Sequence, residues 1–166
     1  MLALLGAELV LTPAADRMPG AIAKAQEIVD TTDKAIMLQQ FQNPANPEVH
    51  RHTTAEEIWK DTGGKIDVFV AGIGTGGTIT GAAEVLKERN PNIKVIAVEP
   101  AVRHHKLSGL KRVTGLPEEH FPKILDRDVI DEFVSVTDEQ AFKAGIRIAR
   151  SDGVLVGPTT GAVLHA

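Results

Sequence analysis

Apolar positions recur at two different spacings along the chain, and these spacings predict where strands and helices lie. Glu8–Thr12 is a short apolar run that predicts a strand, and Pro19–Val29 carries apolar residues three and four positions apart, as in an amphipathic helix. Ala35–Leu38 predicts a second short strand. The stretch QNPANPE that follows contains two prolines, which we expect to stop any helix or strand from running through it.

The rest of the chain alternates between the same two patterns. Thr53–Lys60 fits a helix, with Thr53 or Thr54 as its N-cap and a glutamate near the third position. Further elements are predicted, in chain order, at strand Asp67–Ala71, helix Thr78–Arg89, strand Lys94–Val98, strand Phe133–Val136, helix Asp138–Arg150, strand Val154–Val156 and a helix near Gly161. Strands alternating with helices predict a three-layer α/β fold with a mainly parallel sheet and right-handed crossovers.

A glycine-rich loop, GIGTGGT, joins the strand that ends at Ala71 to the helix that begins at Thr78. In a parallel sheet, ligands bind beyond the carboxyl ends of the strands, where this loop lies. Its glycines can adopt positive φ and let backbone N–H groups approach a ligand closely. The helix that follows offers unpaired N–H donors and the positive end of its dipole. The loop therefore predicts an anion site, most often one for phosphate.

The pattern alone leaves three interpretations of the loop open. It fits a loose G-x-G-x-x-G dinucleotide pattern, and Glu99, about 20 residues further on, has the spacing of a ribose-binding acid. A tight glycine turn that serves helix–sheet packing is the second interpretation, and a phosphate site of another kind is the third. A P-loop is excluded, because no Gly-Lys-Ser/Thr follows the glycines.

Composition excludes several classes of protein. The net charge of −4 and pI near 5.8 argue against a dedicated nucleic-acid binder. The chain has no cysteine, so disulfides, a thiolate nucleophile and a cysteine-ligated zinc site are excluded. His50 and His52 lie two residues apart beside a helix cap, and no Asp/Glu/His cluster completes a metal site with them, so we interpret them as surface residues. No apolar run approaches the ~20 residues of a membrane span and no secretory signal is evident, so the cytoplasm is the expected location.

Four motifs together carry a resemblance to a known family. GIGTGGTITG, preceded by LQQFQNPANPEVHRHTTAEEIW and followed by VIAVEP and GPTTGA, resembles the cysteine synthases, or O-acetylserine sulfhydrylases. These belong to the fold type II enzymes that use pyridoxal 5'-phosphate (PLP). The similarity runs from Leu4 to Ala162. The glycine loop is shared by the whole superfamily, whereas QQFQNPANP is specific to the sulfhydrylase and β-synthase branch.

The resemblance implies roles for individual residues. Thr159 matches the hydroxyl residue that hydrogen-bonds the pyridine nitrogen, which leaves the ring a weaker electron sink and suits β-elimination. Gln40 and Phe41 match residues that line the substrate site, with Gln40 donating to the substrate carboxylate. The PLP phosphate is implied to bind the backbone N–H groups and threonine hydroxyls of Gly74, Thr75, Gly76, Gly77 and Thr78.

The sequence departs from the family pattern in two ways. The Schiff-base lysine and the Ser/Thr-Ser-Gly-Asn-Thr-like loop that grips the substrate carboxylate are both absent, so no catalytic residue is assigned and we expect this chain alone to be inactive. It is interpreted as a fragment, with residues 1–41 as the remnant of the smaller domain and 42–166 as an incomplete larger PLP-binding domain. Lys111 and Arg112 stand where glycine is common. They are interpreted either as a solvent-facing basic turn or as substrate-binding residues.

The expected function is that of a PLP-dependent cysteine synthase, a transferase that replaces the acetate of O-acetylserine, or the phosphate of O-phosphoserine, with sulfide. The alternatives are a cystathionine β-synthase or serine/threonine dehydratase of the same fold, and a non-catalytic fragment that binds phosphate or a nucleotide. The expected partners are small-molecule substrates and a second copy in a homodimeric parent enzyme. We expect neither a nucleic-acid nor a membrane partner, and no metal.

Overall fold

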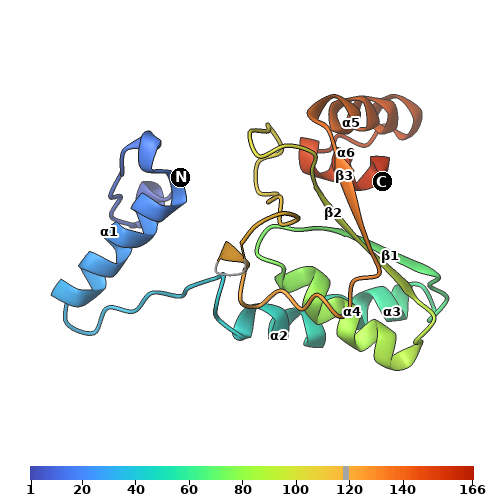
Figure 1. Ribbon diagram of the computed structural model, residues 1–166, viewed down its shortest axis with the longest axis horizontal. Coiled ribbons are helices and arrows are strands. Elements are labelled where there is room, and N and C mark those ends of the chain that lie inside the picture. The colour runs from blue at the N-terminus through green and yellow to red at the C-terminus, as the bar shows by residue number, and fades with distance from the viewer. Residues whose placement is uncertain (118–119) are drawn as a thin grey trace. The chain divides into compact units, whose positions relative to one another are not determined.

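The computed structural model describes residues 1–117 and 120–166 and divides the chain into two compact units, Met1–Gln39 and Gln40–Ala166. Each unit is described by itself. The first, drawn in blue in Figure 1, contains two short 3-10 turns and one helix: η1 (Ala3–Leu5), η2 (Ala14–Asp16) and α1 (Arg17–Thr31). Helix α1 confirms the helix expected over Pro19–Val29 and extends it at both ends.

Two strands expected in the first unit are not formed. Neither Glu8–Thr12 nor Ala35–Leu38 is a strand, and every strand in the described residues belongs to the second unit. A strand needs a neighbour to receive its backbone hydrogen bonds, and an apolar run cannot supply that neighbour itself. Within the first of these runs, Leu9 is 53% exposed and Leu11 is 91% exposed.

The second unit is built on a three-stranded parallel sheet in the order β1-β2-β3. The strands are β1 (Val68–Gly72), β2 (Lys94–Pro100) and β3 (Glu132–Val136). Their register places Ala71 beside Ala97 and Val98 beside Val134. The expected α/β class with a parallel sheet is confirmed. The strand expected at Val154–Val156 is wrong, because this segment pairs with no strand in the described chain.

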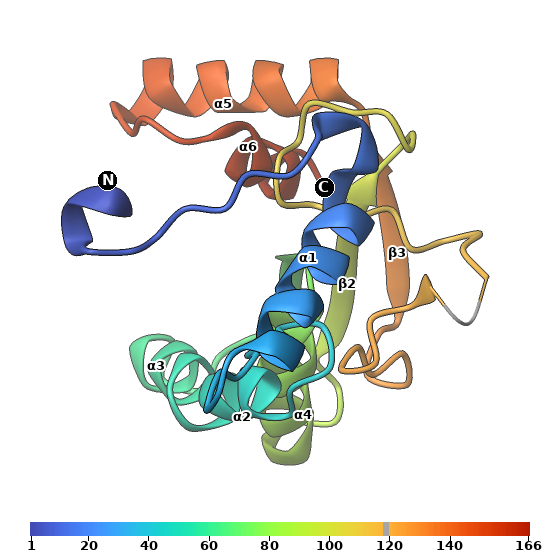
Figure 2. The same ribbon diagram turned by 90° about the vertical axis from the view of Figure 1, so that its left-hand side faces the viewer.

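Helices cover both faces of this sheet, and Figures 1 and 2 show them on opposite sides of it. One face carries the group of α2, α3 and α4, and the other carries α5 and α6. Their bounds are α2 (Ala45–His52), α3 (Thr54–Asp61), α4 (Gly77–Arg89), α5 (Asp138–Asp152) and α6 (Pro158–His165). No helix in the described part of the chain is long and apolar enough to cross a membrane.

Alternating side chains of each strand build two separate cores. On β2, Val95 and Ala97 are buried against α4, whereas Val98 lies in the core beneath α5 and α6. Phe69 of β1 and Phe133 of β3 pack on the α4 side in the same way. This period of two, on strands buried on both faces, sends alternate side chains into the two cores.

Helix α2 runs through the proline-rich stretch that was expected to be non-helical. It begins at Ala45, and Pro47 occupies its third position. The backbone nitrogens of a first helical turn have no acceptor within the helix, so proline costs no hydrogen bond there. Thr53 is the N-cap residue of α3, as expected, but its side chain does not cap the helix, because its hydroxyl donates to the carbonyl of Val49 at 2.6 Å.

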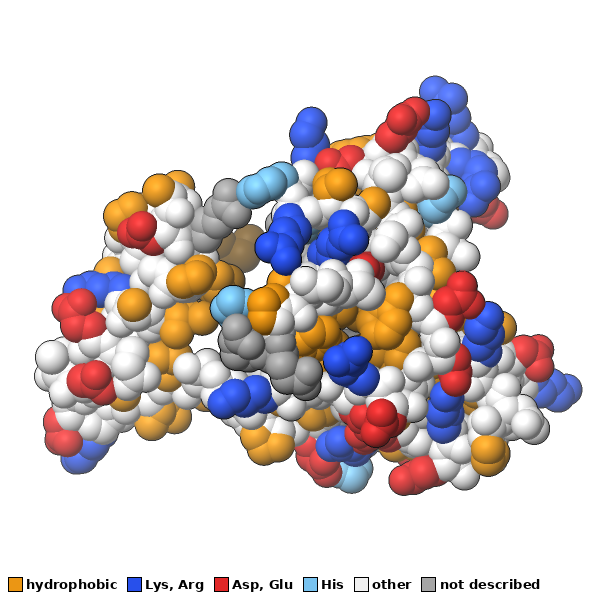
Figure 3. Space-filling model, in the orientation of Figure 1, with side chains coloured by type: hydrophobic (Ala, Val, Ile, Leu, Met, Phe, Trp, Pro, Cys, Tyr) orange, Lys and Arg blue, Asp and Glu red, His pale blue; other side chains and the backbone are white. Residues whose placement is uncertain are grey.

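Acidic and basic side chains are interspersed over the face of the second unit drawn in Figure 3. Ion pairs link neighbouring elements, with Lys87 of α4 2.8 Å from Asp131 and Lys94 of β2 2.6 Å from Glu132. A hydrogen bond from Lys87 lowers the pKa of the Asp131 carboxyl. The backbone N–H of Val95 also donates to Asp131, at 2.7 Å, so this residue ties the start of β3 to both β2 and α4.

Candidate functional site: a glycine loop at the carboxyl end of the sheet

The glycine loop lies where the sequence predicts it, between the end of β1 at Gly72 and the start of α4 at Gly77. Gly76 forms the N-cap of α4 with φ of +92°, a conformation that glycine adopts without strain. Within the described residues, the backbone N–H groups of Gly74, Thr75 and Gly76 donate to no acceptor. These donors, at a helix N-terminus, are what an anion site requires.

Glycine at two positions serves close packing between α2 and α4. A Cβ on Gly77 would lie 1.9 Å from Oδ1 of Asn46, and a Cβ on Gly81 would lie 2.1 Å from the carbonyl oxygen of Pro47. Both glycines therefore let α2 rest directly on the first turns of α4. The packing interpretation of the loop is correct for Gly77, and it coexists with the free N–H groups that precede this residue.

Asn46 of α2 connects the glycine loop to the segment that carries Gln40. Its side-chain amide nitrogen lies 2.8 Å from the carbonyl oxygen of Gln40 and 3.1 Å from Oγ1 of Thr75. The Gln40 side chain itself is exposed. Two residues with expected ligand roles, Gln40 and Thr75, are thus brought together by a third residue that the sequence did not single out.

His50 lies one turn further along α2 and contacts the same loop. Its Nε2 is 3.1 Å from Oγ1 of Thr78, and its Nδ1 is 2.8 Å from Oγ1 of Thr54. His50 is therefore half-buried between two hydroxyls rather than a freely solvated surface residue. Asn46 and His50 are four residues apart, so their shared role was detectable from sequence only if α2 had been recognised as a helix.

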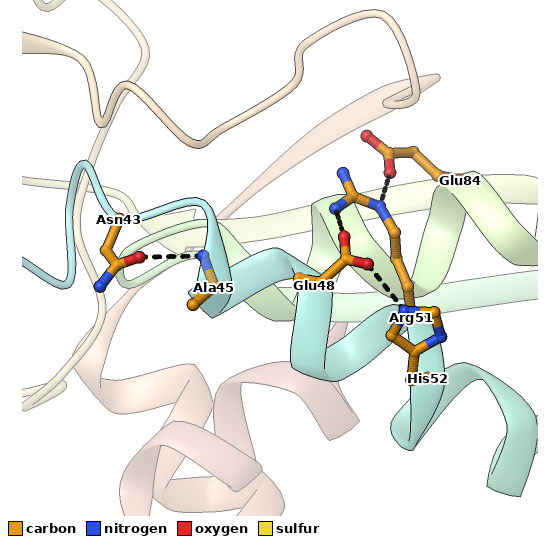
Figure 4. A network of polar contacts seen from close by, with 6 residues as sticks. All are labelled: Asn43, Ala45, Glu48, Arg51, His52 and Glu84. Atoms are coloured by element: carbon orange, nitrogen blue, oxygen red, sulfur yellow. Dashed lines mark hydrogen bonds and ion pairs between the residues drawn. The ribbon is translucent and has the colours of Figure 1, made fainter.

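A charged network fixes α2 against α4 (Figure 4). Arg51 donates to Glu84 of α4 and, at 2.7 Å, to Glu48 within α2, and His52 lies 2.7 Å from the same Glu48 carboxylate. The bond to Glu84 raises the pKa of the Arg51 guanidinium. Bonds from Arg51 and His52 lower the pKa of Glu48. The described residues contain no group of three or more His, Cys, Asp or Glu that could hold a metal ion.

Lys111 lies beside the loop rather than in a solvent-facing turn. Its backbone N–H donates to the carbonyl of Ile73 at 2.7 Å. Its ammonium is 5.4 Å from the centre of the Phe41 ring and donates to the carbonyl of His120 at 3.1 Å. Burial lowers the pKa of this ammonium. Arg112 takes the opposite direction and donates to the carbonyl of Ala101.

Thr159 is the second residue of α6, and its side chain is half-buried. Helix α6 packs beside the carboxyl end of β1, where Cγ2 of Val163 lies 3.6 Å from the position that a Cβ on Gly72 would occupy. Among the described residues, the Thr159 hydroxyl has no hydrogen-bonding partner. Thr159 therefore belongs to the same end of the sheet as the glycine loop.

Glu99 is fully buried at the end of β2 and is not free to bind a ribose. Its carboxylate accepts from the N–H groups of Val113 at 2.8 Å and Thr114 at 3.0 Å, and from the Thr114 hydroxyl. The hydroxyl of Ser135 on β3 adds a longer bond of 3.3 Å. The Glu99 carboxylate is thus bonded within the fold. Its spacing from the glycine loop therefore no longer favours a dinucleotide site.

Comparison with known proteins assigns the family. A family model described as pyridoxal-phosphate dependent enzyme matches residues 1–166. The chain belongs to the family of pyridoxal-phosphate dependent enzymes. The expected membership of fold type II is confirmed as well. A crystal structure of a hydrogen sulfide-producing enzyme from Fusobacterium nucleatum superposes with a TM-score of 0.90 at 35% identity, covering 99% of this chain and 57% of that one.

Curated relatives place the chain near the cysteine synthases. The probable cysteine synthase of Bacillus subtilis (strain 168) is 44% identical over 167 residues, which cover 97% of this chain and 54% of the relative. Cysteine synthase A of Escherichia coli (strain K12) is 41% identical over 178 residues, which cover 100% of this chain and 55% of the relative. The chain thus spans about half the length of the curated relatives that it matches.

The residues present fit the phosphate of the family's cofactor. A phosphate dianion accepts several short hydrogen bonds and needs a site without bulky side chains. Here, Gly74, Thr75 and Gly76 offer backbone donors that are unused by the described chain. A Cβ on Gly74 would lie 2.6 Å from the carbonyl of Gly109, so only glycine leaves this side of the loop open.

Proposed function

We propose that this chain supplies the cofactor-phosphate site and part of the substrate site of a cysteine synthase. The reaction is replacement of the acetate of O-acetylserine by sulfide to give cysteine. The observation that supports this most is that the backbone N–H groups of Gly74–Gly76 have no acceptor within the described residues. Asn46 links this loop to the segment of Gln40. Identities of 44% and 41% to cysteine synthases point to the same activity.

In this proposal, the loop binds the phosphate of PLP. The donors are the N–H groups of Gly74, Thr75, Gly76 and Thr78 and the hydroxyls of the two threonines. The N–H of Gly77 supports the loop instead, because it donates to Oγ1 of Thr75 at 3.3 Å. The hydroxyl of Thr159 meets the pyridine nitrogen. When bound, PLP supplies an electron sink for the elimination and addition steps. The chain's own contribution is to hold the phosphate and ring in one orientation.

Gln40 and Phe41 are proposed to orient the amino-acid substrate. The Gln40 amide donates to the substrate carboxylate, while its backbone carbonyl is already fixed by Asn46 at 2.8 Å. The Phe41 carbonyl accepts from the backbone N–H of Lys123 at 3.0 Å, which holds the next residue as well. Fixed backbones on both residues reduce the entropy lost when the substrate binds.

Lys111 is proposed to interact with an anionic leaving group. This contact would allow the enzyme to use O-phosphoserine, whose leaving group is phosphate. The ammonium lies over the Phe41 ring, on a segment bonded to the glycine loop. Arg112 is the second basic residue of this segment. Its guanidinium is engaged by the Ala101 carbonyl, so it serves as the matched control.

For the complete protein we also propose the domains, the location and the oligomeric state. Residues 1–41 are assigned to the smaller domain and 42–166 to the larger one, and the enzyme is assigned as a cytoplasmic homodimer. The resemblance to cysteine synthases supports these assignments. Light scattering after size-exclusion chromatography of the complete protein tests the dimer, since a monomeric mass contradicts it.

The test of function compares Gln40→Ala with Gln42→Ala, a neighbouring exposed glutamine, in the complete protein. Loss of a hydrogen bond to a charged carboxylate lowers kcat/KM for O-acetylserine by about 10- to 100-fold. Gln42→Ala should remain near the wild type. Absence of cysteine formation by the wild type contradicts the function, whereas equal effects of the two variants contradict the role of Gln40.

A further inference from the structure

The hydroxyl oxygen of Thr75 accepts two hydrogen bonds within the fold. One comes from the side-chain amide of Asn46 at 3.1 Å, and the other from the backbone N–H of Gly77 at 3.3 Å. A threonine hydroxyl has two acceptor lone pairs and one hydrogen to donate. With both lone pairs engaged, the hydrogen is left over, and no acceptor for it exists among the described residues. The Thr75 hydroxyl is thereby set as a donor.

The orientation of the Asn46 amide follows from its neighbours. The carbonyl oxygen of Gln40, 2.8 Å away, can only accept, so the amide nitrogen must face it. The same nitrogen donates its other hydrogen to Thr75. The amide oxygen fills the space that a Cβ on Gly77 would need, at 1.9 Å. A flipped amide would place two oxygens face to face at the Gln40 contact.

Two contacts between α2 and α4 hold the helix that carries Asn46 in place. Asn46 is in the first turn of α2, and its neighbour Pro47 rests on Gly81 of α4. One turn later, Arg51 is bonded to Glu84 of α4. The amide therefore sits on a helix that cannot slide along α4 without breaking these contacts, which is the kind of support a preorganised donor needs.

We propose that Asn46 is a positioning residue that fixes the Thr75 hydroxyl as a donor to the cofactor phosphate and joins this donor to the backbone of Gln40. The inference rests on the proposed function, in which the loop binds that phosphate. Phosphate oxygens only accept, so a hydroxyl already committed to donating binds them without first reorienting. The arrangement also links the cofactor loop to the substrate-binding segment through a single side chain.

The test is a double-mutant cycle on the 166-residue chain. Asn46→Ala removes the amide, and Thr75→Val removes the hydroxyl while keeping the shape of the side chain. PLP and inorganic phosphate are titrated separately by calorimetry. Asn46→Ala should weaken both ligands by about 10-fold in the wild-type background and by less than about 3-fold in the Thr75→Val background. Thr75→Ser should bind both ligands much as the wild type does.

Several outcomes overturn the inference while leaving the function intact. In the first, the wild type binds PLP and Asn46→Ala binds it with the same affinity. In the second, Asn46→Ala weakens binding equally in the wild-type and Thr75→Val backgrounds, which indicates a purely structural effect. If Asn46→Ala lowers the affinity for PLP but not for inorganic phosphate, the effect lies at the pyridine ring, and the inference is also overturned. If Asn46→Ala does not fold, Asn46→Leu, which keeps a similar side-chain volume without a donor, replaces it. Absence of PLP binding by the folded wild type contradicts the proposed function and the inference together.

Discussion

The backbone N–H of Lys111 donates to the carbonyl oxygen of Ile73 at 2.7 Å, so the segment that carries Lys111 runs along the glycine loop. The Lys111 ammonium is held over the Phe41 ring, 5.4 Å from its centre. From the sequence alone, Lys111 could be either a surface residue or a substrate-binding residue. The structure places it against the glycine loop and Phe41, both of which have proposed ligand roles. It also makes the choice of substrate experimentally accessible.

Replacement of Lys111 should change substrate preference. In the complete protein, Lys111→Met removes the cation beside the site and lowers the ratio of kcat/KM for O-phosphoserine to that for O-acetylserine by about 10-fold. Arg112→Met is the control, because its guanidinium is bonded to Ala101. An unchanged ratio in Lys111→Met shows that this cation does not contribute to selectivity. Because burial lowers the pKa of the Lys111 ammonium, this ratio should also fall with rising pH, at a lower pH than the ordinary lysine pKa of ~10.4 would give.

A carboxylate at Thr78 should repel the phosphate. Thr78 is exposed in the first turn of α4, so Thr78→Asp places a negative charge at the proposed anion site without filling the core. Binding of PLP to the chain should weaken by about 10-fold or more, whereas the neutral isostere Thr78→Asn should change it much less. Equal affinities of the two variants would falsify a phosphate site at this position. Gly76 is a poorer probe, since its φ is +92° and a Cβ there would lie 2.8 Å from Leu125 Cβ.

Two helical glycines should respond oppositely to alanine. Gly81→Ala drives a Cβ toward the backbone carbonyl of Pro47 and should lower the free energy of unfolding by about 2 kcal/mol. Gly145→Ala, within α5, meets only Cγ2 of Val156 at 3.7 Å and should raise it by about 0.5 to 1 kcal/mol. Urea unfolding measures both. A neutral Gly81→Ala shows that α2 does not pack as closely on α4 as described.

The buried carboxylate of Glu99 should be needed for stability rather than for binding. Glu99→Gln puts an amide NH2 group among donors from Val113 and Thr114, which leaves at least one buried donor unpaired. The expected loss is about 1 to 3 kcal/mol in the free energy of unfolding. Glu57→Gln, at an exposed position in α3, is the control and should change it by less than about 0.5 kcal/mol. Similar stabilities of the two variants contradict this role.

Acid should remove the contribution of Asp131. Its pKa is lowered in the folded state by the bond from Lys87. A depressed carboxyl pKa stabilises the fold above the unfolded value of ~3.9, and this stabilisation is lost as pH falls through the folded value. The difference in unfolding free energy between wild type and Asp131→Asn should therefore be present at pH 7 and vanish in acid. A difference that is independent of pH assigns it to packing instead.

Local patterns predict the elements whose buried side chains follow a regular spacing within one segment of the chain. The apolar runs at β1 and β2 and the helix between them were found because each buries its own period of side chains. The strands expected at Glu8–Thr12 and Val154–Val156 failed because pairing depends on distant partners, which a local run does not encode. Helix α2 is not predicted from the sequence because proline normally ends a helix, whereas Pro47 stands in the first turn, where it costs no hydrogen bond.

The site was predictable at the level of motif but not of contact. The glycine loop is visible in the sequence because it has four glycines in six positions, Gly72 to Gly77, between a predicted strand and a predicted helix. The importance of Asn46 and His50 depends on how closely α2 crosses α4, which is fixed by Gly77 and Gly81. Likewise, Glu99 has the spacing of a ribose ligand, and only its burial beside Val113 shows that its oxygens are already used.

Backbone NMR of the chain during a PLP titration tests the central claim most directly, because it observes the donors themselves. The amide signals of Gly74, Thr75 and Gly76 should shift in a saturable manner, together with those of Gly77 and Thr78. The amide of Gly153, at the far end of α5, should stay unchanged. Inorganic phosphate should move the same loop signals in the same direction. Saturable shifts that spare the glycine loop, or no shifts at all in the folded chain, contradict the account.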